Sequence, residues 1–157
     1  MRTVCAILLS AVVGLPTVAA KDRHCQLRLH TEANLHDTMA FATFVPAKVS
    51  GRKAAIEQAA RITEADVTAF YPYHAADGSY GALVQLDEHG RAILEALSIE
   101  RRGSSLFVFV NGRPITELQI DKRVSDGKIY IASGLTEADI KLMKKDWRLI
   151  GQKKRKR

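Results

Sequence analysis

The chain has 157 residues, of which 46% are hydrophobic and 26% are charged, and its formal net charge is +7. This length and composition fit one globular domain that is large enough to bury a core without disulfide or metal support. The two cysteines, Cys5 and Cys25, are too few for a disulfide framework.

The N-terminus has the pattern of a cleavable signal peptide. Arg2 precedes an apolar run over residues 4–13, and the small residues at 18–20 form a site that signal peptidase accepts. A membrane anchor is disfavoured because this run is much shorter than the roughly 20 apolar residues that span a bilayer. We therefore predict a signal peptide over residues 1–20, cleaved before Lys21, and a periplasmic or secreted mature protein.

The mature chain opens with residues that alternate as in a β-strand. Cys25, Leu27 and Leu29 would share one face of this strand, so we interpret Cys25 as a buried small hydrophobe. A reactive thiol or an intermolecular disulfide at Cys25 stays open, because Cys5 leaves with the signal peptide. The polar residues 31–38 predict a loop after the strand.

Two further elements are predicted before residue 62. Residues 41–49 have the composition of a second strand, which ends at Ser50-Gly51. Residues 52–60 are rich in alanine, glutamate and lysine, which favours a short helix.

A short motif occurs twice, as Ile62-Thr63-Glu64-Ala65-Asp66-Val67 and as Leu135-Thr136-Glu137-Ala138-Asp139-Ile140. In each copy the threonine is placed to cap a helix, and the acid three residues later is placed to accept from the threonine amide. Both copies therefore predict helix starts. We expect the first helix to be short, because Tyr71-Pro72 favours an extended backbone, and the second to continue through Trp147.

A strand and a helix are predicted between these two starts. A turn at residues 77–79 leads into an apolar strand over residues 80–86. Asp87 then caps a helix over residues 88–102, and Gly103 ends it. The core-facing positions of this helix are Ile93, Leu94 and Leu97.

The last third of the chain predicts strands joined by tight turns. Residues 106–110 are apolar on both faces, as in a central strand, and Asn111-Gly112 favours a type I′ hairpin turn into a strand over residues 115–120. Another strand is predicted over residues 128–132, and Gly134 precedes the final helix. Hairpins between helices predict an α+β fold: one small domain whose mainly antiparallel sheet has helices packed on one face.

The order of these parts resembles the head subdomain of the first periplasmic region of SecD, in the SecDF family of the bacterial protein-export translocase. The resemblance rests on Ile62-Thr63-Glu64-Ala65-Asp66-Val67, Val84-Gln85-Leu86-Asp87-Glu88-His89-Gly90, Leu106-Phe107-Val108-Phe109-Val110-Asn111-Gly112-Arg113-Pro114-Ile115, Ile120, Gly127-Lys128-Ile129-Tyr130-Ile131-Ala132-Ser133-Gly134 and Leu135-Thr136-Glu137-Ala138-Asp139. It implies a surface that contacts translocating polypeptide and brings no catalytic residue. SecD proteins also carry membrane helices that couple export to the proton gradient. Because no such segment follows the signal peptide, we expect the head without the proton-driven motor.

Positive charge gathers near the C-terminus. The predicted parts are the signal peptide (1–20), N-terminal strands with a connecting helix (21–61), a SecD-head-like α/β domain (62–150) and a disordered basic tail (151–157). The predicted contacts to an anionic lipid or polymer are Lys144, Lys145, Arg148, Lys153, Lys154, Arg155, Lys156 and Arg157. A tail that only confers solubility is the alternative. Specific nucleic-acid binding is not predicted, since Trp147 is the only aromatic residue near these cations.

The residues do not predict catalysis. The histidines are His24, His30, His36, His74 and His89. Residues 30–37 hold two of them but lack the spacing and number of ligands of a zinc site. No Gly-x-Ser-x-Gly elbow or glycine-rich phosphate loop is present. We therefore predict no catalytic, metal or cofactor residue and no cofactor.

The predicted function is non-enzymatic binding of polypeptides or of an envelope component by an exported protein. Phe107 and Phe109 are candidates for a peptide-binding face, although such residues more often lie in the core. The alternatives are a cationic envelope-binding protein that acts through its basic tail and a small metal-dependent hydrolase.

Overall fold

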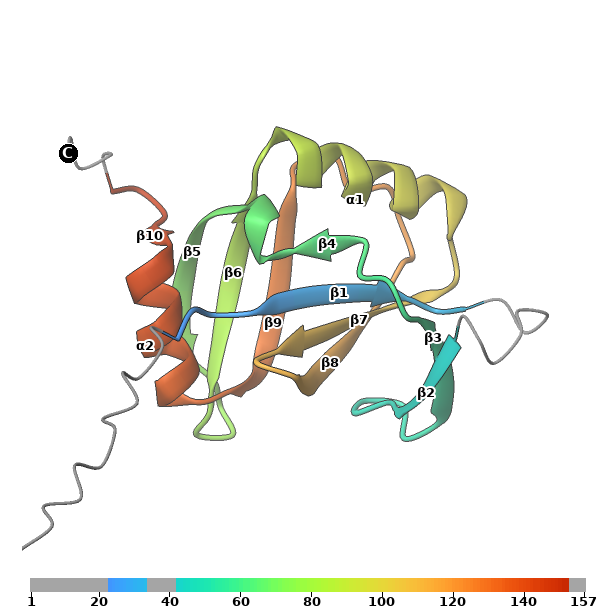
Figure 1. Cartoon of the computed structure of the whole chain (residues 1–157), viewed down its shortest axis with the longest axis horizontal. Helices are drawn as coiled ribbons and strands as arrows, with labels where there is room; N and C mark the ends of the chain where they lie inside the picture. Colours follow the sequence, from blue (N-terminus) through green and yellow to red (C-terminus); the bar gives the residue numbers. More distant parts are fainter. Residues whose placement is uncertain (1–22, 34–41, 153–157) are drawn as a thin grey trace, which may run out of the picture.

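The computed structural model describes residues 23–33 and 42–152. The predicted signal peptide, most of the predicted polar loop and residues 153–157 lie outside this part. Figure 1 shows how the strands and helices of the described part are arranged.

Eight strands form two four-stranded sheets. The β1 sheet has the order β4 (Ile62–Thr63), β1 (Leu27–Thr31), β7 (Ser105–Val110) and β8 (Arg113–Gln119). The β6 sheet has the order β10 (Arg148–Leu149), β5 (Val67–His74), β6 (Tyr80–Leu86) and β9 (Lys128–Leu135). A separate hairpin is formed by β2 (Ala42–Pro46) and β3 (Lys53–Glu57). The strand pairs are antiparallel except for β10 and β5.

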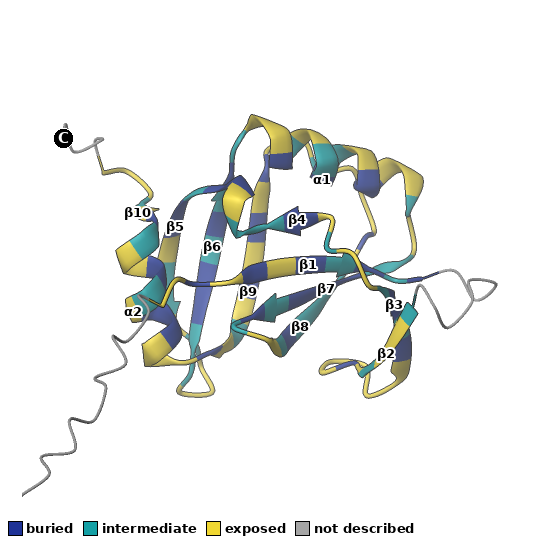
Figure 2. Cartoon of the chain, in the orientation of Figure 1, coloured by how far each residue is buried: buried dark blue, intermediate teal, exposed yellow. Residues whose placement is uncertain are grey.

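The two large sheets enclose one hydrophobic core. Because side chains alternate between the faces of a strand, each sheet sends every second residue inward, and Figure 2 shows this alternation along β9. The fully buried residues of this core include Leu27, Leu29, Val108, Phe70, Val84 and Ile131. Each sheet therefore also has an outer face that the core does not use.

Two α-helices of the described part complete the core. α1 (Glu88–Glu100) begins at Asp87, whose carboxylate accepts a hydrogen bond of 2.8 Å from the Gly90 N–H. α2 (Glu137–Asp146) begins at Thr136 in a capping box. In Figure 1, α1 lies along the top of the molecule and α2 stands at its left end. The helix residues that enter the core are Leu94, Leu97, Ile140 and Met143.

The predicted α+β class with mainly antiparallel strands is confirmed. The predicted strand over residues 80–86 coincides with β6, and the predicted hairpin turn has φ of 51° at Asn111 and 77° at Gly112. Cys25 is buried as expected, with 2% of its surface exposed. No helix of the described part has the length and apolar character needed to cross a membrane.

The helix predicted over residues 52–60 is wrong. These residues contain β3, which pairs with β2 in an antiparallel ladder. Ala54 and Ile56 are both buried while their neighbours are less so, which is the period of two of a strand. Helix propensities differ by at most about 0.7 kcal/mol per ordinary residue. The ladder and the burial of Ile56 against Phe107 outweigh that preference.

Several predicted boundaries also differ from the structure. The first capped turn is only a 3-10 helix, η1 (Glu64–Asp66), and β5 begins directly after it at Val67. Tyr71-Pro72 therefore lies within a strand and does not end the helix. Gly134 lies inside β9 with φ of 94°, and Trp147 follows α2 as its C-cap.

Candidate functional site

A row of aromatic and aliphatic side chains crosses the outer face of the β6 sheet. Tyr71 on β5 is paired with Leu83 on β6, and Leu83 is paired with Tyr130 on β9. The two tyrosines are 56% and 57% exposed, and Leu83 between them is partly buried. Adjacent strands lie about 4.8 Å apart, so the tyrosines are about 10 Å apart with Leu83 between them. We call Tyr71, Tyr73, Leu83 and Tyr130 the tyrosine face.

Tyr73 lies beside this row on the same face and contacts Tyr130. Its ring stacks on that of Tyr130, with centroids 5.5 Å apart and an interplanar angle of 10°. Its hydroxyl donates a hydrogen bond of 2.6 Å to the Ile131 carbonyl. A Cβ atom at Gly81 would lie 2.3 Å from the Tyr73 ring, so glycine is needed there for the ring to lie across β6. Burial raises the pKa of the Tyr73 hydroxyl above its usual value. Tyr73 is thus a fixed neutral donor that holds Tyr130 in place.

A second row, with a cation at each end, lies beside the tyrosine face. Arg148 is paired with Ala69, Ala69 with Gln85, and Gln85 with Lys128. Arg148 and Lys128 are exposed, and neither forms an ion pair with another residue in the described ranges 23–33 and 42–152. Ala69, Gln85 and Arg148 also line an open hollow of about 280 Å³ with Ile150. The four strands of the β6 sheet contain no aspartate or glutamate. This outer face is therefore aromatic and positively charged.

The structure brings only one of the predicted anion-binding residues onto this face. Arg148 belongs to it, whereas Lys144 and Lys145 are exposed residues of α2. The predicted contacts Lys153, Lys154, Arg155, Lys156 and Arg157 lie outside the described residues. Sequence reasoning missed the tyrosines. The alternation of Lys128, Ile129, Tyr130 and Ile131 was the signal that would have placed Tyr130 beside Lys128 on an outward face.

The two phenylalanines proposed for a peptide-binding face have different surroundings. Phe107 is 2% exposed and packs under the β2–β3 hairpin against Ala54 and Ile56. Phe109 is only partly buried at the edge of the same cluster. The core interpretation is therefore correct for Phe107, and Phe109 remains accessible on the outer face of the β1 sheet.

One group of side chains in the described part has the composition of a metal site. Asp66, Asp87 and His89 offer ligand atoms within 4.8 Å of one another. These atoms already have structural partners: His89 Nδ1 bonds to Asp66 at 2.8 Å, and Asp87 accepts from the Gly90 N–H. The other Asp66 oxygen accepts from the Thr63 N–H at 2.8 Å. Because each contact completes the start of η1 or α1, the group fits helix capping.

Comparisons with known proteins support the sequence resemblance at the level of the fold. The sequence matches no protein-family model and no curated protein. A solved structure of SecDF in a super-membrane-facing form superimposes with a TM-score of 0.54 at 14% identity, over 80% of this chain and 19% of that chain. A second, of SecDF described as a membrane component that enhances protein export, gives a TM-score of 0.55 at 14% identity, over 91% of this chain and 78% of that chain.

The fold is SecDF-like. The resemblance predicted from the order of capped helices and hairpins is therefore confirmed for the fold. The chain spans about a fifth of the length of the first SecDF chain. The activity and partners of the whole SecDF protein consequently enter only as proposals for this chain.

Proposed function

We propose that this protein is an exported, non-enzymatic module that holds extended polypeptide segments on the tyrosine face. The observation that carries the proposal is the pair of exposed rings, Tyr71 and Tyr130, which the antiparallel register places on either side of the partly buried Leu83. Tyrosine offers a large amphipathic contact area with only two rotatable side-chain bonds, so it loses little entropy on binding. An exposed apolar patch with a polar rim is typical of a binding surface.

The charges beside the row favour acidic segments. Arg148 and Lys128 lack ion-pair partners in the described residues and lie on the same outer face as the tyrosines. Exposed charges of this kind increase the rate of association and give it a salt dependence, more than they add affinity. The SecDF-like fold supports the proposal, because one of the matching SecDF structures is of a component that enhances protein export.

The proposal is tested with reduced, carboxymethylated α-lactalbumin, which is acidic and stays unfolded. We expect fluorescence anisotropy to give micromolar binding to this chain and none to native α-lactalbumin. Replacing Tyr71 and Tyr130 together by alanine should weaken binding at least about tenfold, as for the loss of two central aromatic contacts. The matched control is Phe44→Ala, which removes a ring that is 58% exposed on β2. Equal binding by the double variant and the control would refute the proposal.

The alternative, envelope binding through the basic tail, stays a prediction. It requires that deletion of residues 153–157 abolish a salt-sensitive association with vesicles containing anionic lipid. The polypeptide proposal requires that the same deletion leave binding of carboxymethylated α-lactalbumin by the tyrosine face within about twofold. The two measurements on one variant therefore separate the two functions.

A further inference from the structure

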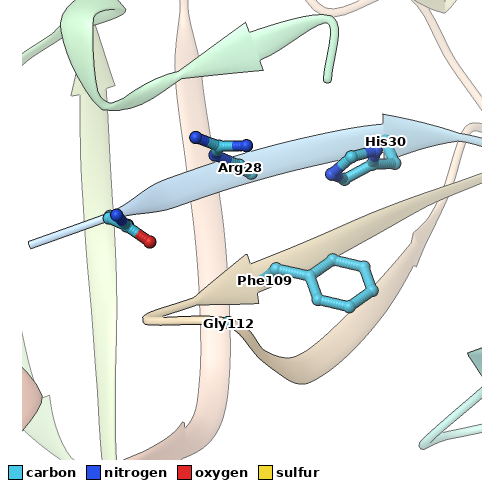
Figure 3. A pocket seen from close by; sticks show the side chains of 5 residues that line it. Arg28, His30, Phe109 and Gly112 are labelled. Atoms are coloured by element: carbon cyan, nitrogen blue, oxygen red, sulfur yellow. The ribbon is translucent and has the colours of Figure 1, made fainter. Parts of the chain in front are cut away.

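A second uncovered surface lies on the outer face of the β1 sheet. Figure 3 shows Arg28 and His30 on β1 above Phe109 on β7, around a hollow of about 260 Å³. The remaining lining residues are Gln26 and Gly112. This hollow, which we call the Arg28 hollow, belongs to a different sheet from the tyrosine face, so any ligand here is independent of the proposed function.

Arg28 is an uncompensated charge in this hollow. It lies directly across from Phe109 on one side and Thr63 on the other, at the spacing of cross-strand neighbours. It forms no ion pair or hydrogen bond with the residues that the structure describes. An exposed guanidinium beside an aromatic ring, with no carboxylate to neutralise it, is a donor available to an external anion.

Two acidic residues that contact the borders of the hollow already have partners. Glu57 binds Arg61 at 2.7 Å and Arg101 at 2.8 Å. Asp139, next to the β7–β8 turn, accepts hydrogen bonds from Asn111 and Arg113. Neither carboxylate is available to Arg28 unless it gives up these bonds.

The ring of His30 is held in one orientation. Its Nδ1 lies 2.8 Å from the Glu57 carbonyl, which only accepts, so Nδ1 carries the proton and donates. The ring also meets that of Phe109 edge to face, with centroids 5.3 Å apart and an interplanar angle of 74°. The His30 and Phe109 rings therefore form an aromatic wall beside the Arg28 guanidinium.

We propose that the Arg28 hollow binds a carboxylate carried on a short apolar stem, with Arg28 donating to the carboxylate and the His30 and Phe109 rings contacting the stem. The planar fork of a guanidinium matches the two oxygens of a carboxylate. A single cation suits this singly charged group better than a phosphate. Glutamate side chains and small free organic acids share this chemistry, and the experiment separates the two sources.

The test is a titration followed by the Gly112 amide and His30 ring resonances of the isotope-labelled protein. N-acetylglutamic acid α-amide should shift these signals with millimolar half-saturation, as expected for one charged contact with some apolar area. N-acetylglutamine α-amide, which differs only by lacking the charge, should leave them unchanged. A lower half-saturation for the glutamate probe than for propionate identifies a peptide side chain as the source, and the reverse order identifies a free acid.

Arg28→Gln should raise the half-saturation at least about tenfold. The matched control Lys122→Gln removes an exposed cation from the loop between β8 and β9 and should change it less than about twofold. Unchanged amide signals elsewhere in the spectrum verify that each variant is folded. Equal shifts with the glutamine probe, or equal effects of the two substitutions, would overturn the inference.

Discussion

Replacing Asp139 by asparagine tests how α2 is fastened to the β1 sheet. The buried carboxylate accepts from the Thr136 N–H at 2.8 Å and the Thr136 hydroxyl at 2.7 Å, and it also accepts from Asn111 and Arg113. It therefore joins the start of the helix to the turn between β7 and β8. Asparagine keeps the shape of the side chain but removes its charge. It also places an NH₂ group, which donates, against neighbouring groups that donate as well.

The size of the effect follows from these contacts. Charge-assisted hydrogen bonds contribute about 1.5–3 kcal/mol each, and breaking a buried ion pair costs about 3–5 kcal/mol. The Arg113 side chain is 48% exposed and regains water, so the lower end applies. We expect Asp139→Asn to lower the free energy of unfolding by about 3 kcal/mol, or Tm by about 10 °C for a domain of this size.

Urea denaturation and thermal melts measure the loss. The matched control is Glu137→Gln, which removes a charge from the same helical turn at a side chain that is 67% exposed, and which should cost less than about 0.5 kcal/mol. Burial alone would raise the pKa of Asp139, but the bonds from Thr136 and Asn111 and the charge of Arg113 hold it below its usual value of 3.8. The stability from Asp139 is thus present above pH 3.8 and disappears as the pH falls through the lowered pKa. If Asp139→Asn and Glu137→Gln were equally stable, the argument for this junction would be wrong.

Three further predictions concern single positions. The hydrogen bond that the His89 ring donates to the Asp66 carboxylate raises the pKa of His89, so the stability that this pair contributes is present below about pH 6.5 and decreases as the pH rises through the raised pKa. The free energy of unfolding of His89→Gln, measured by urea denaturation at several pH values, should not show this decrease. Gly81→Ala should displace the Tyr73 ring, lower stability by about 2 kcal/mol and weaken polypeptide binding. Burial raises the pKa of Cys25 to about 12, so Ellman's reagent should label it at pH 8 only after unfolding, and rapid labelling of the folded protein would contradict its burial.

Local signals in the sequence predicted most of the elements. Asp87, the two threonine caps and Asn111-Gly112 act through contacts within a few residues, so their patterns carried enough information to place helices and a turn. The helix prediction around Ala54 and Ile56 was wrong because the conformation of this segment depends on pairing with β2 and on packing against Phe107, which is remote in sequence.

The candidate site was harder to predict than the fold. Tyr71 and Tyr130 are separated by about sixty residues, and only the register of three strands brings them into one row. Their exposure depends on which face of the β6 sheet meets the core, and the composition of single strands does not decide that. Arg148 was predicted as part of a basic patch near the C-terminus, and the parallel pairing of β10 with β5 places it on the same outer face as these tyrosines.

The position of β1 has a consequence for how the chain acquires its structure. β1 is an inner strand, yet its longest ladder is with β7, about eighty residues later in the chain. A ribosome must release residues 105–110 before that ladder is able to form, and nascent chains that depend on such distant pairing fold late. The β1 strand consequently lacks its β7 partner until about two thirds of the chain has been synthesised.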